Sequence, residues 1–140
     1  MPSRQISDLC EELQLLAVSF LAEVNGSPVF KKAGAHAFLT CTYRSDAEQD
    51  ALYAKGRTAP GRKVTNARTG QSAHNCTEGQ KPAARAFDFA VQCSDGSLDW
   101  NAHGGLWRAA VDIGRGIGLE SGEKWGDSAH FQLKDWRKVV

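Results

Sequence analysis

Large apolar residues recur every three or four positions near the start of the chain. This spacing predicts an amphipathic helix over residues 8–25, capped at Ser7-Asp8 and ending near Asn25-Gly26. The apolar positions that define the helix are Leu9, Leu13, Leu16, Phe20 and Val24. We expect this helix to pack against the rest of the fold.

A run of β-forming residues at positions 37–43 predicts a strand. Directly after it, Ser45 or Asp46 is suited to cap a helix that continues to about Lys55-Gly56. Arg44 is therefore expected at the junction between the end of a strand and the start of a helix.

Residues 57–71 are rich in Gly, Pro, Thr, Asn and basic residues and have no apolar period, which predicts a long surface loop. Loops of this length in compact domains are usually functional or mobile. The next segment, 84–92, alternates as strands do: Phe87 and Phe89 are expected on one face and Asp88 on the other.

A turn at 94–97 leads to a predicted helix at 106–117 and a last short strand at 129–133. These elements predict an α+β fold, a small antiparallel sheet with flanking helices. A chain of 140 residues suits one domain over 1–140, with the N-terminal helix packed on it.

Composition narrows the setting. With 17 basic and 16 acidic residues the net charge is +1, so we expect no general affinity for nucleic acid. No apolar run approaches the roughly 20 residues that span a bilayer, and the first residues lack a signal-peptide core. We therefore expect no stable membrane association, a cytoplasmic location and a monomer.

Four cysteines are scattered without a CxxC pair, which argues against a zinc ribbon or a thioredoxin-like motif. Cys10, Cys41 and Cys93 lie within or beside apolar stretches, so we expect them to be small, buried and reduced.

Candidate chemistry lies in the second half of the chain. His74 follows Ser72-Ala73, Asp88 comes fourteen positions later, and His130 closes the segment Asp127-Ser-Ala-His. Two histidines and a carboxylate form a complete set of protein ligands for a catalytic zinc and leave one position for water. Asp127, three residues before His130, is placed to act on that water.

Other interpretations of these residues stay open from the pattern alone. Asp88, inside an apolar strand, needs a partner, and a salt bridge to Arg85 or Arg44 would serve as well as a metal. His74 and His130 also suit solvent-exposed positions. His36 and His103 are weaker candidates, each expected at the surface or at a cap, although either is an alternative to His74 as a ligand.

Taken together, four blocks resemble the zinc D-alanyl-D-alanine carboxypeptidase family, which includes vancomycin-resistance D,D-dipeptidases and the L-alanyl-D-glutamate endopeptidases of phage endolysins. The blocks are Thr42-Tyr43-Arg44-Ser45 with Gln49, Ser72-Ala-His74, Ala86-Phe-Asp88 and Asp127-Ser-Ala-His130-Phe-Gln132. The resemblance runs from about Phe38 to Leu133 and has the blocks in the same order.

The resemblance implies a role for each aligned residue. It makes His74, Asp88 and His130 the zinc ligands, Asp127 the acidic general base, Arg44 a support for the substrate or its oxyanion, and Ser72 a substrate contact. The family's histidine-to-aspartate gap is usually shorter. We expect the extra residues 76–82 to form a loop that leaves both ligands in place, with Glu78 as a rival ligand.

The resemblance further implies cleavage of peptidoglycan stem peptides, with an L-alanyl-D-glutamate endopeptidase endolysin favoured over a D-alanyl-D-alanine carboxypeptidase or dipeptidase. Such an endolysin stays in the host cytoplasm until it is released to the cell wall. Two other classes remain: a zinc-bearing binding domain without turnover, like the hedgehog signalling domain, and a metal-free structural protein. Trp107 is expected in the core, and Trp125 in the core or the cleft. The basic side chains of the 57–71 loop are expected to be solvated or to contact anionic wall polymer.

Overall fold

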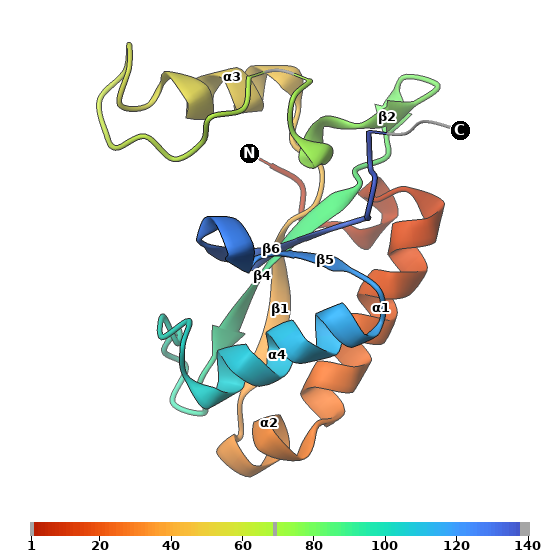
Figure 1. Ribbon diagram of the computed structural model, residues 1–140, viewed down its shortest axis with the longest axis vertical. Helices are drawn as coiled ribbons and strands as arrows, with labels where there is room; N and C mark the ends of the chain where they lie inside the picture. The colour runs from red at the N-terminus through yellow and green to blue at the C-terminus, as the bar shows by residue number, and fades with distance from the viewer. Residues whose placement is uncertain (1, 69, 138–140) are drawn as a thin grey trace.

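The fold is a four-stranded antiparallel sheet with helices against it, as seen in a computed structural model that describes residues 2–68 and 70–137 (Figure 1). The strand order is β1-β4-β6-β5. The strands are β1 (His36–Cys41), β4 (Ala86–Gln92), β5 (Glu120–Gly122) and β6 (Asp127–Gln132). The predicted α+β class with a small antiparallel sheet is therefore confirmed, although β5 was not predicted.

Within residues 2–68 and 70–137, four helices accompany the sheet. They are α1 (Glu11–Gly26), α2 (Pro28–Ala33), α3 (Asp46–Ala54) and α4 (Gly105–Gly116). Figure 1 shows α1, α2 and α4 grouped beside the sheet, while α3 lies apart at the other end of the molecule. Three short 3-10 turns, η1 (Ile6–Asp8), η2 (Ala73–Asn75) and η3 (Glu123–Trp125), complete the order together with a small hairpin, β2 (Thr77–Glu78) and β3 (Lys81–Pro82). None of the helices in the described part of the chain has the length and apolarity to cross a membrane.

The first helix begins later than the sequence predicted. Residues 6–8 form the 3-10 turn η1, and Cys10 N–H donates to the carbonyl of Ala84 at 2.9 Å, so the backbone is still extended at Cys10, the residue before α1. The Asp8 carboxylate accepts a hydrogen bond from Ser3 and caps no helix. The Ser7-Asp8 cap was therefore wrong, because a pairing with distant backbone replaces it.

Helix α2 was not predicted, although its signals are present in the sequence. Ser27 caps it by accepting from Phe30 N–H, Pro28 occupies the first turn, and Gly34 ends it with a left-handed φ of 64°. These are the residues that helix starts and ends favour.

Helix α3 starts where the sequence predicted. The Ser45 hydroxyl accepts from Glu48 N–H, and the Glu48 carboxylate accepts from Ser45 N–H, which makes a capping box. This cap fixes the chain direction immediately after Arg44.

The central strand β4 has two chemically different faces, as the alternation predicted. Phe87, Phe89 and Val91 are fully or almost fully buried in the core. On the opposite face, Asp88 pairs in register with His130 on β6 and with Cys41 on β1. One strand therefore contributes to both the core and the candidate site.

Aromatic rings fill the core between α1 and the sheet. The Phe20 ring centroid lies 5.5 Å from that of Phe87, 5.1 Å from that of Phe89 and 5.2 Å from that of Phe131. Trp107 packs on Phe89 at 4.9 Å, so its predicted core position is confirmed. Cys10 and Cys41 are buried and Cys93 is half-buried, all with free thiols.

Close packing of α4 on the sheet gives a direct test of this core. A methyl group at Gly114 would overlap the Phe131 ring, whereas one at Gly116 would meet no atom within 4 Å. We expect Gly114→Ala to lower the free energy of unfolding by about 1–3 kcal/mol, because overpacked cores must distort. Gly116→Ala, on the same helix, is the control and should be neutral or slightly stabilising. Chemical denaturation measures both, and equal stabilities would contradict the packing of α4 on Phe131.

Candidate metal centre

The three predicted metal ligands meet at one oxygen atom. Asp88 Oδ1 lies 3.3 Å from His74 Nε2 and 3.2 Å from His130 Nδ1. The two imidazole rings lie 5.1 Å apart between centroids, at an interplanar angle of 71°. Residues separated by up to 56 positions in the chain, from His74 to His130, are thus brought into one cluster.

Local structure holds His74 in place. It lies in η2, where the Ser72 hydroxyl accepts from His74 N–H and Asn75 Oδ1 accepts from Ser72 N–H. The carbonyl of His74 accepts from Arg44 N–H at 2.9 Å, which ties η2 to the start of α3. The sequence placed His74 in a polar segment, but these contacts bury it almost completely.

Each imidazole is also fixed through its other nitrogen. His74 Nδ1 lies 2.8 Å from the carbonyl oxygen of Thr42, which can only accept, so Nδ1 carries the proton. On the other side, the Glu120 carboxylate accepts from Gln132 Nε2 at 2.6 Å, which turns Gln132 Oε1 toward His130. His130 Nε2 lies 2.8 Å from that oxygen and must donate to it.

Neutral imidazoles held in this way direct a lone pair from His74 Nε2 and from His130 Nδ1 toward Asp88. The two nitrogen lone pairs and the negatively charged carboxylate oxygen repel one another unless a cation lies between them. The orientation of metal-binding histidines by a second acceptor is usual in metalloproteins. Two atoms bound to one tetrahedral zinc lie about 3.3 Å apart, which matches both nitrogen–oxygen distances. The donor set and its spacing therefore fit a zinc ion.

The pKa values of His74 and Asp88 also show that the cluster favours a bound positive charge. Burial alone would lower the pKa of His74, but the Asp88 carboxylate outweighs it and raises that pKa to about 10. Burial would likewise raise the pKa of Asp88, yet the charge of the nearby His74 outweighs burial and holds that pKa well below its usual value. Without a metal, the site would keep a proton in the metal's place.

Two groups of potential ligand atoms share Asp88, each with mutual distances within 4.8 Å. One group adds Cys41 and His74, and the other adds Asp127 and His130. Cys41 Sγ lies 3.7 Å from His74 Nδ1, the nitrogen already bonded to Thr42, and Cys41 is buried and does not line the cleft. Asp127 lies on the open side of the cluster.

Other residues considered from sequence lie elsewhere. Glu78 is exposed in the β2–β3 hairpin, which turns through Gly79 and Gln80 at positive φ and accommodates the longer gap between His74 and Asp88 as predicted. The structure places Glu78 outside both ligand groups. His36 and His103 are exposed, in agreement with the surface positions expected for them.

Asp127 begins β6 at the mouth of the cluster, two residues before the predicted strand start. Its side chain is open to solvent on one side and faces Asp88 and His130 on the other. Desolvation in the cleft, followed by the negative charge of Asp88, raises the pKa of Asp127. A carboxylate with a raised pKa beside the metal group is suited to take and return a proton.

Arg44 lies on the opposite side of Asp88. Its Nη2 is 3.9 Å from Asp88 Oδ2, and its Nη1 donates to Gln49 Oε1 at 2.9 Å. The buried Nε atom has no hydrogen-bond partner among the described residues. The predicted salt bridge to Arg44 is thus a long contact, while Arg85 donates to the carbonyl of Trp136 instead.

Gln49, Asn75 and Gln132 are the supporting residues that sequence reasoning did not assign. Gln49 is fully buried, accepts from Arg44 and lies 3.4 Å from Asn75 Nδ2. The sequence did contain a signal for Gln49, because it is a polar residue within the predicted helix that follows Arg44.

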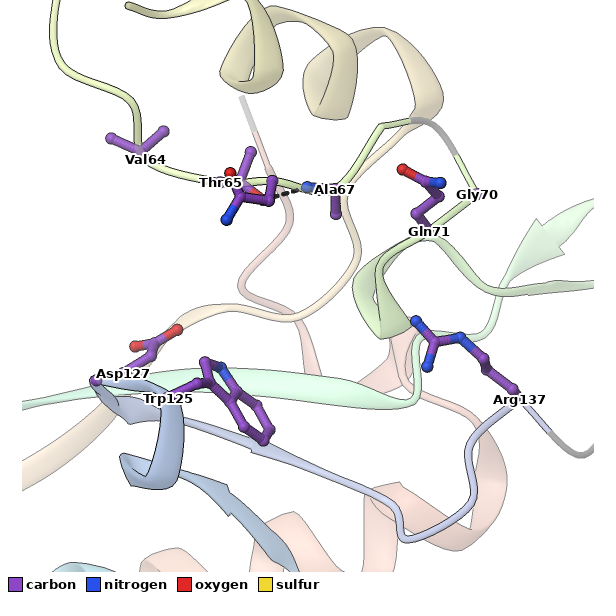
Figure 2. Close-up of a pocket in the computed structure, with 10 residues that line it drawn as sticks. Val64, Thr65, Ala67, Gly70, Gln71, Trp125, Asp127 and Arg137 are labelled. Carbon is purple, nitrogen blue, oxygen red and sulfur yellow. Dashed lines mark hydrogen bonds between the residues drawn. The ribbon is translucent and has the colours of Figure 1, made fainter.

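A cleft of about 570 Å³ contains the cluster. Figure 2 shows Val64, Thr65 and Ala67 on one side of its outer part and Trp125 and Asp127 on the other, with Arg137 near one end. Trp125 is half exposed, and its ring lies 5.9 Å from that of His130, so it belongs to the cleft and not to the core. Ser72 also lines the cleft, although its hydroxyl accepts from His74 N–H.

This fold and site are accompanied by a clear similarity in sequence. No family model matches the chain. The chain is 39% identical over 110 residues to the peptidoglycan L-alanyl-D-glutamate endopeptidase CwlK of Bacillus subtilis (strain 168), an alignment that covers 71% of this chain and 62% of that protein. The chain thus spans less than two thirds of its relative's length. The similarity agrees with the resemblance found in the motifs, because the protein that the chain matches is a peptidoglycan L-alanyl-D-glutamate endopeptidase.

The hydrogen-bond relay from Glu120 through Gln132 to His130 can be tested by measuring metal affinity. Gln132→Leu removes the acceptor of His130 Nε2–H, so the ring is no longer held in the tautomer that binds metal. We expect zinc affinity to fall about 10-fold to 100-fold, as for other outer-shell partners. Gln92→Leu, on β4 and outside the cleft, is the control and should bind zinc as the wild type does. Competition with a chromogenic chelator measures both, and equal affinities would exclude the relay.

Proposed function

We propose that this protein is a zinc-dependent peptidase that cleaves the L-alanyl-D-glutamate bond of peptidoglycan stem peptides. The observation that carries the proposal is the approach of two imidazoles, each bonded through its far nitrogen, to one carboxylate oxygen. The bond specificity is taken from the relative's name, and the relative's full length exceeds the part matched here.

His74, Asp88 and His130 would hold the zinc ion. Bound there, zinc supplies a Lewis acid that polarises a carbonyl and lowers the pKa of a coordinated water to roughly 7. A site with two nitrogens and one oxygen from the protein is typical of catalytic zinc peptidases.

Asp127 would move the proton. Its carboxylate would accept a proton from the attacking water and then deliver it to the nitrogen of the departing D-glutamate amine. The raised pKa supports this role, because a carboxylate with a raised pKa accepts a proton more readily than an ordinary aspartate does. Its place within 4.8 Å of Asp88 and His130 ligand atoms gives it reach to a water between them.

Arg44 would stabilise negative charge on the substrate side. The Gln49 contact orients the guanidinium, and the cleft gives it access to a peptide carbonyl or carboxylate.

An endolysin role is the finer part of the proposal. Its support is the resemblance of four motif blocks to phage L-alanyl-D-glutamate endopeptidases, and it includes a cytoplasmic location before release to the wall. Adding purified protein to outer-membrane-permeabilised or Gram-positive cells and recording the loss of turbidity tests this part separately from peptide cleavage.

Asp127→Asn tests the proton-transfer role. We expect kcat on soluble muropeptides to fall by about 10²–10⁴-fold, because the amide cannot accept the proton. Asp112→Asn, an exposed change on α4, is the control and should leave the rate unchanged. Mass spectrometry of the products identifies the bond that the wild type cuts. Release of terminal D-alanine would favour a D-alanyl-D-alanine carboxypeptidase, and full activity of Asp127→Asn would remove Asp127 from the mechanism.

Metal content tests the ligand set. We expect about one zinc per chain in protein purified without chelator, and a strong loss of zinc in Asp88→Asn, because the amide is a weaker ligand than the carboxylate. Asp127→Asn, which changes the same functional group nearby, should retain its zinc. Elemental analysis measures all three, and a metal-free wild type that still folds would support the structural alternative.

A further inference from the structure

One wall of the cleft is a segment without regular secondary structure. Residues 64–67 line the cleft opposite Trp125 and Asp127, yet they belong to no helix or strand (Figure 2). Sheet or helix hydrogen bonds therefore do not hold this wall in position. Its attachment must come from side chains.

The Tyr53 ring in the last turn of α3 contacts one arginine before this segment in the chain and one after it. The guanidinium carbon of Arg57, which precedes the wall, lies 3.9 Å from the ring centroid. That of Arg68, which follows the wall, lies 4.9 Å from the same centroid. Both distances are within the range of cation–π attraction. One aromatic ring thus brings together the two flanks of the wall.

Arg57 adds hydrogen bonds that reach into the wall itself. Its Nη1 donates to the carbonyls of Tyr53 at 2.7 Å and Thr65 at 3.0 Å, and its Nη2 lies 3.1 Å from Asn66 Oδ1. A planar guanidinium with several fixed donors suits this arrangement better than a lysine would.

Gln49 fixes the wall one helical turn earlier. It lies four residues before Tyr53 and therefore on the same face of α3. Its Nε2 donates to the carbonyl of Ala67 at 2.7 Å, while its Oε1 accepts from Arg44. One face of α3 thus connects the wall to the arginine beside Asp88.

The burial of the basic residues in this loop agrees in part with the solvated positions expected for them. Arg62, Lys63 and Arg68 are exposed, whereas Arg57 is half-buried. Arg57 and Arg68 also lie over the Tyr53 ring, so these two arginines contribute to the conformation of the loop.

We propose that Tyr53, together with Arg57 and Arg68, is a positioning clamp that holds residues 64–67 against the cleft and thereby determines how well the peptide substrate binds. The proposal extends the proposed function, because the wall faces the same metal group. None of the three residues contacts the reacting atoms, so the clamp acts on KM and not on the chemical step.

The experiment compares Tyr53→Leu with Tyr53→Phe, which keeps the ring. Amide hydrogen exchange over residues 63–71 reports the wall without any need for activity. We expect exchange there to rise about tenfold in Tyr53→Leu and to rise clearly less in Tyr53→Phe, which keeps the ring but loses the hydroxyl beside Arg68. Arg57→Gln should behave like Tyr53→Leu. Arg62→Gln, which removes the same charge from the same loop, is the matched control and should change nothing.

Steady-state kinetics on soluble muropeptides complete the test. We expect KM to rise about tenfold in Tyr53→Leu and in Arg57→Gln, with kcat, zinc content and Tm unchanged. The rise in KM should be clearly smaller in Tyr53→Phe. Unchanged exchange in both disruptive variants would overturn the clamp. Faster exchange with an unchanged KM would overturn its role in substrate binding. If the wild type cleaves no muropeptide, the proposed function fails while exchange still decides the clamp.

Discussion

The site depends on the meeting of Asp88 with two imidazoles whose other nitrogens are already committed. The Thr42 carbonyl and the Gln132 amide oxygen set the tautomers of His74 and His130, so both rings present a lone pair toward one carboxylate. Buried groups arranged in this way create a negative electrostatic potential, which a bound cation would neutralise. The same geometry explains why a proton would be held so strongly there in the absence of metal.

The sheet provides the rigidity that this meeting requires. Asp88 is on the central strand, and its neighbours Phe87 and Phe89 pack with Phe20 and Phe131 on the other face. A shift of the strand by one residue would exchange the two faces and bury the carboxylate among phenylalanines. The aromatic core therefore fixes the register that brings Asp88 opposite His130. The aromatic core therefore both stabilises the fold and fixes the position of Asp88.

Much of this arrangement was predictable because it follows from local patterns. The alternation around Asp88, the Ser45 cap and the long loop at 57–71 were read correctly from spacing and residue type. The start of α1 was not, because Cys10 is held extended by backbone pairing with Ala84, a residue more than seventy positions away. Strand β5 was missed for a similar reason: three residues carry no periodic signal, and pairing with β6 defines them. The relay from Glu120 through Gln132 to His130 likewise depends on contacts between strands.

The metal side and the substrate side of the cleft are built differently. Asp88 and His130 come from paired strands and His74 from a turn bonded to them, whereas the facing wall is a loop held by the side chains of one helix. Strand register tolerates almost no variation, but a loop fixed by a tyrosine, two arginines and a glutamine tolerates changes in length and sequence between its attachment points. In the proposed peptidase, such a division would let one metal centre serve peptides of different shape, because the wall could change while the ligands stayed in place. Gln49 joins the two parts, since it contacts both Arg44 beside Asp88 and the wall at Ala67.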